Sequence, residues 1–313
     1  MTKLSDIVHL KNLLGSPEVC PDFDPAHELI NDFMFYVQTH PVRLHDVERD
    51  LLDSASNVKS AYSKFQDRVA LARQRCQDAI EALEPEYYQA STRLYEQEMI
   101  FETSDYILNR RLQADDDSNL KLRGRLLQLT DWRLPALVFR PGLESFVEEL
   151  VPLDPMYIVD HNQELLQPAL SKFTAEYQRR LRIYTINDRT SDEILSELPT
   201  NQFGLTFAYN FFNYKPIEVI QRYLKELFVK LRSGGSLIMT YNECDRDHGV
   251  CLAERNFMCY TPGHRIVSMA ENIGFELSEK YIGQGDLAWF EFKKPGSINS
   301  LRGGQTLAQI MPK

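Results

Sequence analysis

The first third of the chain carries a stripe of apolar and small residues at helical spacing. The stripe runs from Leu44 to Leu83 in steps that are mainly three and four residues long, which predicts a long amphipathic helix with one apolar face. At Val47, Leu51 and Ala55 the step of four is repeated, a stutter that relaxes a supercoil locally without losing the seam. The pattern therefore indicates a coiled-coil-like helix whose apolar face needs a partner.

Pro85 ends this stripe, and the residues after it predict a second helix. Proline cannot donate the backbone hydrogen bond that a continuing helix requires, so we expect a turn or a kink at Pro85. Residues 86–113 contain no glycine or proline, and two arrangements fit them: an antiparallel hairpin with the first helix or a coiled coil between chains. The acidic stretch ADDDS at 114–118 favours a turn, so we expect a helical N-terminal region over residues 1–118.

From Trp132 onward, short apolar runs alternate with helical stretches, which is typical of an α/β domain with a largely parallel sheet. The apolar runs predict strands at Ala136–Phe139, Met156–Val159, Arg182–Ile186, Gly204–Ala208 and Ser236–Tyr241. Helices are expected to begin near Gly142, Asn162, Asp192, Pro216 and Pro262. The last two runs, FELSEKYI and LAWFEFKK, flank a GQG turn and predict an antiparallel pair. We therefore expect the α/β domain over residues 119–295 and a tail over residues 296–313.

Several phrases in this domain resemble the class I S-adenosylmethionine-dependent methyltransferases, over residues 131–294. They are RPGLESFVEEL after the first strand, YIVDHNQELL at the second, FAYNFFNY at the fourth, and KLRSGGSLIMTYN, which looks like the family's helix, Gly-Gly turn and fifth strand. The resemblance implies a Rossmann-like sheet that is mostly parallel with an antiparallel last strand, preceded here by a helical hairpin or coiled-coil region. It also implies S-adenosyl-L-methionine as the cofactor and methyl transfer as the activity.

The resemblance places the cofactor at one edge of the sheet. In open α/β sheets, ligands bind outside the carboxyl ends of the strands, at the switch point between the first and fourth strands here. The family usually has an acid near the end of the first strand and three spaced glycines after it. In this chain, Val138, Arg140, Gly142 and Glu144 stand at these four positions. The resemblance assigns Gly142 and Arg140 to cofactor binding, with Arg140 either pairing the cofactor's carboxylate or forming a salt bridge to Glu144 or to a helix acid.

Polar residues also follow the second and third strands. Asp160 ends the run MYIVD, about 20 residues beyond the first strand, where the resemblance implies that an acid accepts both ribose hydroxyls. The alternative is that Asp160 caps the helix after it. Asn187 and Asp188 follow the third strand, where the resemblance implies recognition of the adenine amine, and a turn is the alternative.

The stretch after the fourth strand, YNFFNY, carries the candidate chemistry. Nucleic-acid amine methyltransferases of this fold have Asn/Asp-Pro-Pro-Tyr/Phe there, and the proline pair is absent from this chain. We expect Asn210 to line the pocket, where it contacts the cofactor and acts with Tyr214 on the acceptor. As the proton acceptor we favour His248, because an imidazole titrates near neutral pH. Asp245 and Asp247 in the same loop are alternatives, and a solvated surface histidine is the plainer interpretation.

Composition narrows the class of partner. A net charge of -10 leaves no overall basic footprint, so a small molecule or a protein is favoured over nucleic acid as the methyl acceptor, and no membrane partner is expected. The five cysteines form no CxxC pair, so no zinc site is predicted. The chain has no leader-like or membrane-spanning apolar run, and we expect a cytoplasmic protein with reduced thiols.

Two functional classes fit the sequence. One is a methyltransferase that binds its cofactor through an altered first loop and uses the N-terminal helices to form an oligomer or to cover the substrate. The other is a catalytically inactive methyltransferase-fold protein that acts as a structural or assembly module through those helices. The second class explains Arg140 and Glu144 directly, whereas Asp160 and the polar end of the fourth strand favour the first.

Overall fold

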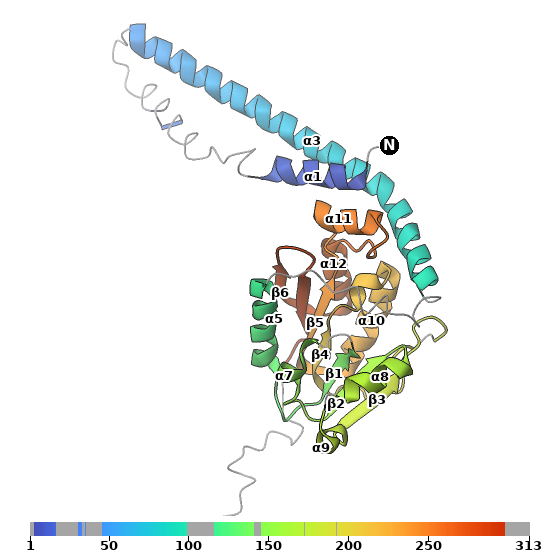
Figure 1. Ribbon diagram of the computed structural model, residues 1–313. Coiled ribbons are helices and arrows are strands. Elements are labelled where there is room, and N and C mark those ends of the chain that lie inside the picture. Colours follow the sequence, from blue (N-terminus) through green and yellow to red (C-terminus); the bar gives the residue numbers. More distant parts are fainter. Residues whose placement is uncertain are drawn as a thin grey trace, which may run out of the picture. The chain divides into compact units, whose positions relative to one another are not determined.

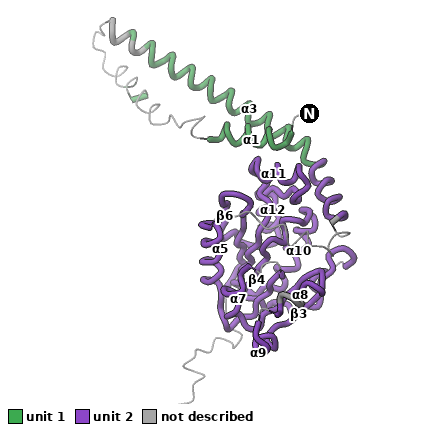
Figure 2. The backbone as a smooth tube through the Cα atoms, viewed as in Figure 1, with its two compact units in different colours: residues 1–85 green, residues 86–313 purple. Residues whose placement is uncertain are grey.

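Two compact units make up the chain. The computed structural model describes residues 3–16, 31–32, 35, 46–98, 116–140, 145–171, 173–191 and 193–297. Contacts divide the chain into Met1–Pro85 and Glu86–Lys313 (Figure 2), whereas the composition break lies later, at residues 114–118. Among the described residues, no helix combines the length and the apolarity that a bilayer-spanning segment needs.

The first unit contains α1 (Leu4–Gly15) and most of α3 (Asp46–Glu98) (Figure 1). Two side chains connect the helices: Lys11 Nζ donates to Gln77 Oε1 at 2.6 Å, and Arg73 Nε donates to the carbonyl oxygen of Leu14 at 2.8 Å. Along the predicted apolar stripe, Val58 and Phe65 are 58% and 42% exposed. This part of the stripe is therefore largely uncovered by the described residues.

The helix α3 continues through Pro85, so of the turn and the kink expected there, the turn is wrong. Residues 86–98, predicted to start a second helix, are the last turns of the same helix. The rings of Tyr88 and Tyr260 lie 5.3 Å apart, and Ser91 Oγ accepts the backbone N–H of Tyr260 at 2.7 Å. These contacts stabilise the helical conformation of the segment within the second unit. They offset the loss of the backbone hydrogen bond that proline removes. The rest of the predicted helix, residues 99–113, lies outside the described residues.

The second unit is built on a seven-stranded sheet with the order β3-β2-β1-β4-β5-β7-β6. Its strands are β1 (Ala136–Phe139), β2 (Met156–Asp160), β3 (Leu181–Thr185), β4 (Phe203–Ala208), β5 (Leu231–Tyr241), β6 (Glu276–Ile282) and β7 (Ala288–Lys293). The first five are parallel, and β7 lies antiparallel between β5 and β6. All seven predicted strands are confirmed, and the sheet has the Rossmann-like order of the class I methyltransferase fold.

Helices cover both faces of this sheet. They are α5 (Asp116–Leu129), α7 (Val147–Leu150), α8 (Gln163–Leu170), α9 (Ala175–Gln178), α10 (Ile217–Lys230), α11 (Asp247–Glu254) and α12 (Gly263–Ile273), with a 3-10 turn η1 (Phe212–Tyr214). One core contains Tyr223 of α10 and Ile266 of α12. The other contains Leu126 of α5 and Leu166 of α8. The sheet is thus the middle of three layers, and its strand ends stay accessible to loops.

Two helix predictions need correction. The helix expected near Asp192 is absent, and residues 193–198 form turns, because the Glu226 carboxylate accepts the backbone N–H groups of Ile194 and Leu195 at 2.7 and 2.6 Å. The acidic run at 114–118 was interpreted as a break, yet α5 begins within it at Asp116. Acids in a first helical turn interact favourably with the helix dipole, so the same residues begin a helix.

The Gly-Gly pair at 234–235 also differs from the expected turn. It lies inside β5, which begins at Leu231 directly after α10. A register shift between β4 and β5 accompanies it, and Gly234 has a φ of 78°. A bulge at the start of the strand, rather than a separate turn, therefore joins α10 to the sheet.

Candidate functional site

The register of β1 and β2 places Arg140 beside Asp160. Phe139 lies opposite Val159 in the parallel pair, so the next residue of each strand meets the other at the carboxyl edge of the sheet. Arg140 Nε donates to Asp160 Oδ2, and the two side chains are 3% and 7% exposed. A buried ion pair therefore occupies the position where the sequence predicted a ribose-binding acid.

Asp160 also caps the residues that follow it. Its Oδ1 accepts the backbone N–H of Asn162 at 2.8 Å, just before α8. Both carboxylate oxygens thus have a donor within the protein. Each oxygen keeps a second lone pair, so ribose hydroxyls would use these or replace a donor, and Arg140 is the donor carried on a side chain. Gly142 and Glu144, the other residues predicted in the first loop, lie outside the described residues.

Asn187 stabilises the turn after β3. Its Oδ1 accepts the backbone N–H groups of Arg189 and Thr190 at 3.0 and 3.2 Å, and its side chain is exposed. This is the turn role that the sequence left open as an alternative to adenine recognition. Asp188, the neighbouring candidate, is buried and has different partners.

Asp188 is the centre of a buried polar network. Tyr95 Oη donates to its Oδ1 at 2.5 Å, and Tyr223 Oη donates to its Oδ2 at 3.0 Å. Lys215 Nζ lies 3.0 Å from Asp188 Oδ2. His161 Nε2 lies 3.3 Å from the same oxygen and 3.0 Å from Lys215 Nζ. The network joins α3, the ends of β2 and β3, and α10.

The charges of this network are set by burial and by Lys215. Burial by itself raises the pKa of Asp188, but the hydrogen bond from His161 and the charge of Lys215 outweigh it and hold this pKa below its ordinary value. Burial, followed by the charge of Asp188, raises the pKa values of Tyr95 and Tyr223. At neutral pH the network therefore holds one carboxylate, its lysine counter-ion and two protonated phenols.

An open cavity of about 370 Å³ lies beside this network. Its lining includes Tyr95, Asp188, Arg189, Pro216, Val219 and Arg222. Small-molecule sites commonly measure about 300–1,000 Å³. The cavity therefore offers room for a small ligand next to the residues that follow β3 and β4.

The end of β4 is held by backbone geometry and by amide contacts to β5. Asn210 is 8% exposed and adopts a left-handed φ of 53°, and its backbone N–H is donated to Thr240 Oγ1 at 2.7 Å. The Thr240 hydroxyl in turn donates to Asn213 Oδ1 at 2.8 Å. Tyr214 is 8% exposed and belongs to the core cluster that also contains Phe146. Of the two predicted acceptor-side residues, Asn210 lies at the strand edge and Tyr214 is largely a core residue.

Two acids after β5 are paired with basic side chains. Glu243 Oε2 accepts from Tyr241 Oη at 2.6 Å and lies 2.8 Å from Lys280 Nζ. Asp245 Oδ1 lies 2.5 Å from His264 Nδ1. Burial by itself raises the pKa of Asp245, but its hydrogen bond with His264 dominates and the pKa is lowered. A carboxylate with a lowered pKa is a weaker base, which weakens the case for Asp245 as a proton acceptor near neutral pH.

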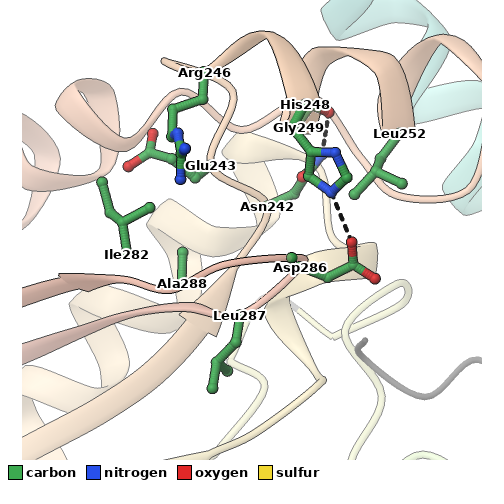
Figure 3. A pocket seen from close by; sticks show the side chains of 11 residues that line it. Asn242, Glu243, Arg246, His248, Gly249, Leu252, Ile282, Asp286, Leu287 and Ala288 are labelled. Carbon is green, nitrogen blue, oxygen red and sulfur yellow. Dashed lines mark hydrogen bonds and ion pairs between the residues drawn. The ribbon is translucent and has the colours of Figure 1, made fainter. Parts of the chain in front are cut away.

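His248, the favoured proton acceptor, faces an aspartate on another element (Figure 3). Its Nε2 lies 2.8 Å from Asp286 Oδ1, with side chains 53% and 7% exposed respectively. Asp286 comes from the turn between β6 and β7, and His248 lies in the first turn of α11. The small pocket between them is about 10 Å³, roughly the space of one water molecule. A substrate would therefore approach the imidazole from its open side.

In the described part of the chain, no group of three or more histidine, cysteine and acidic side chains is placed to hold a metal ion. The polar residues at the sheet edge pair with one another instead.

Comparison with known proteins finds similarity only in structure. No family model matches the chain, and no curated protein is significantly similar to it in sequence. A candidate O-methyltransferase from Nostoc punctiforme is 16% identical over 56% of this chain and 56% of that chain, with a TM-score of 0.44. The N-methyltransferase NodS from Bradyrhizobium japonicum is 13% identical over 58% of this chain and 99% of that chain, with a TM-score of 0.44. Similarity at this level leaves the fold to be judged from the sheet order itself.

The sequence did not predict five residues of this edge. They are Tyr95, His161, Lys215, Tyr223 and Asp286. His161 follows Asp160 directly, and Lys215 follows the stretch ending at Tyr214, so proximity to predicted strand ends was an available signal for both. The remaining three are brought to the edge by tertiary packing, for which the local sequence carries no pattern.

Proposed function

We propose that this chain is an S-adenosylmethionine-dependent methyltransferase whose acceptor is a small molecule or a protein. The observation that carries the proposal is the position of Asp160, a buried carboxylate at the end of β2 beside the switch point between β1 and β4. Ligands of open α/β sheets bind at such a point. The open cavity next to Asp188 also supports the proposal that ligands bind at this edge of the sheet.

The residues fit the adenosine part of this cofactor after one exchange of partners. Asp160 Oδ2 now accepts from Arg140, and a ribose hydroxyl is a donor that can take the same place. The displaced guanidinium would still need a partner, because a buried unpaired charge is costly. The carboxylate of the cofactor is a suitable one, as the sequence hypothesis for Arg140 requires. The buried ion pair would then act as a placeholder that binding opens.

Methyl transfer makes modest demands on the protein. The cofactor supplies an electrophilic methyl group, so positioning of the acceptor and removal of its proton are the tasks left to the chain. Asn210, buried just after β4, would orient the acceptor, and the half-exposed imidazole of His248 would take its proton. Tyr214 is the weaker candidate because it is packed in the core.

A structural or assembly module is the second candidate, and the Arg140–Asp160 pair favours it. The pair is complete without a ligand, since each charge is neutralised by the other. A protein that had lost cofactor binding would gain from such a pair, because it leaves no uncompensated carboxylate at the edge. The N-terminal helices would then carry the function.

Calorimetric titration of the full chain with S-adenosylhomocysteine separates the two candidates. Mass spectrometry first checks that no ligand has co-purified. We expect micromolar binding, and we expect Asp160→Asn to weaken it by at least about tenfold, since a charged acceptor is lost. The matched control is Asp154→Asn, which alters an exposed acid paired with Arg180 at 2.8 Å. Absence of binding at millimolar ligand by a folded protein would support the structural module instead.

A further inference from the structure

His248 is held in place by its backbone and by a carboxylate from a different element. Gly249, the next residue, packs so tightly that a Cβ there would lie 2.2 Å from the backbone oxygen of Glu243. Asn242 Nδ2 donates to the carbonyl oxygen of Gly249 at 2.9 Å. The first turn of α11 is therefore fixed against the end of β5, and His248 is fixed with it.

The partner carboxylate is more buried than the imidazole it contacts. Asp286 is 7% exposed and His248 is 53% exposed. The turn carrying Asp286 is closed by a hydrogen bond from Gly283 N to Leu287 O at 2.9 Å, and Gly285 has a φ of 85°. An ordinary surface ion pair joins two flexible, solvated side chains. Here a buried acid on a closed turn holds one nitrogen of a half-exposed ring.

The contact divides the roles of the two ring nitrogens. Nε2 faces Asp286, and Nδ1 makes no hydrogen bond to the described part of the chain. In the neutral ring, a proton on Nε2 is donated to the carboxylate, and the lone pair stays on Nδ1. An acid that fixes the tautomer and orientation of a histidine in this way is the common support of a general base.

We propose that Asp286 is a positioning residue that presents Nδ1 of His248 as the proton acceptor of the site, a role that rests on the proposed function. In the transfer, a lone pair of the acceptor forms a bond to the methyl carbon, and the carbon–sulfur bond breaks with its electron pair staying on sulfur. The proton of an alcohol or a phenol moves to Nδ1 as the bond forms, whereas an ammonium group gives its proton to Nδ1 first, which frees the nitrogen lone pair. The step needs no oxidant or reductant.

A second pair in the same region provides an internal control. His264 is 58% exposed, close to the exposure of His248, but its Nδ1 is the nitrogen that contacts an aspartate, Asp245. The two imidazoles are therefore held by opposite nitrogens. A reagent that alkylates the nitrogen with the available lone pair should modify them at different positions.

The test is limited alkylation of the full chain with iodoacetamide, with the modified nitrogen of each histidine identified by NMR of isolated peptides. We expect His248 to react mainly at Nδ1 and His264 mainly at Nε2. In each ring the preferred nitrogen should react roughly ten times more than the other, the selectivity that one hydrogen bond to a charged group supplies. In Asp286→Ala the preference of His248 should be lost while that of His264 is kept. Asp286→Glu, which keeps a carboxylate, should restore part of the preference of His248 for Nδ1.

Reaction of wild-type His248 mainly at Nε2, or an unchanged preference in Asp286→Ala, would overturn the positioning role. Both readouts are independent of cofactor. The S-adenosylhomocysteine titration is then repeated on His248→Gln, which we expect to bind as the wild type does, because the imidazole is assigned to the acceptor and not to the cofactor. Loss of binding in that variant would contradict the assignment. Selective alkylation without any binding in the wild type would contradict the proposed function alone.

Discussion

The guanidinium of Arg140 donates to the carboxylate of Asp160 because two parallel strands bring the residues after Phe139 and Val159 side by side. Both residues had been assigned to cofactor binding separately, with Arg140 on the cofactor's carboxylate and Asp160 on its ribose. Their pairing makes the two roles mutually dependent. A ribose hydroxyl that takes the place of Arg140 on Asp160 would free the guanidinium for the cofactor's carboxylate.

Replacing Arg140 with methionine is expected to weaken binding of S-adenosylhomocysteine. The carboxylate of the ligand would lose its charge-assisted hydrogen bond to the guanidinium, worth about 1.5–3 kcal/mol, so affinity should fall roughly tenfold or more. Calorimetry measures the change, and Arg133→Met is the control because Arg133 forms an exposed pair with Asp131 at 2.7 Å. Stronger binding by Arg140→Met would instead show that the guanidinium only competes with the ligand for Asp160.

Removing the hydroxyl of Tyr95 should destabilise the second unit. Tyr95→Phe deletes a hydrogen bond to the ionised Asp188 and is expected to lower the free energy of unfolding by about 1.5–3 kcal/mol. Urea denaturation measures it, with Tyr157→Phe as the control on a half-buried ring. In the Asp188→Asn background the same change should cost less, because the acceptor is no longer charged. Equal costs in both backgrounds would show that Tyr95 does not depend on Asp188.

Alkaline pH should reveal the burial of Tyr177. Its hydroxyl donates to the carbonyl oxygen of Val151 at 2.7 Å, and burial raises its pKa to about 12. The unfolded chain ionises tyrosine near pH 10, so the native state holds this proton more tightly. Its stabilising contribution is therefore complete below about pH 10 and is lost as pH rises to about 12.

The variant Tyr177→Phe isolates this contribution. At pH 7 it should be less stable than the wild type by about 1 kcal/mol, the usual worth of a neutral hydrogen bond. Between pH 10 and 12 that difference should shrink, because the wild type alone loses the phenol contribution. Urea unfolding across this range measures the difference. A constant gap would mean that Tyr177 titrates normally.

Two glycine substitutions should have opposite effects. A Cβ on Gly249 would lie 2.2 Å from the backbone oxygen of Glu243, whereas a Cβ on Gly124, within α5, would have no atom within 4 Å. Gly249→Ala is expected to destabilise by about 3 kcal/mol through overpacking, and Gly124→Ala to stabilise by about 0.5–1 kcal/mol through helix propensity. Thermal unfolding measures both. A tolerated Gly249→Ala would show that the start of α11 can move.

The apolar stripe of α3 is predicted to form an oligomer seam between copies of the chain. Val58 and Phe65 are 58% and 42% exposed, so replacing both with aspartate should dissociate an oligomer without unfolding the unit. Sedimentation measures the mass of the particle, and circular dichroism checks that the helix content is unchanged. The control carries Ser60→Asp and Ser63→Asp, on exposed positions off the stripe. A monomer before and after the change would contradict the seam.

The strands β1, β2, β4 and β5 were predictable because parallel strands buried on both faces have nearly continuous apolar sequences. The ion pair between Arg140 and Asp160 was not predictable from the sequence. Each residue follows a predicted strand, but whether the two side chains meet depends on the register between the strands. The helix expected near Asp192 failed because Glu226 binds the turn from a distant helix. Tyr95 reached Asp188 across 93 residues of chain, and such a contact has no local signature.

The left-handed backbone of Asn210 bears on how this edge can evolve. Asparagine, aspartate and glycine tolerate a positive φ better than other residues do, so the shape of the chain after β4 favours an amide at this position by itself. A lineage that stopped transferring methyl groups would still be selected to keep Asn210, and the edge would go on looking chemically equipped. The substitution Asn210→Gly separates the two roles, because glycine keeps the positive φ and removes the amide. It therefore reveals whether the residue serves the backbone or the chemistry.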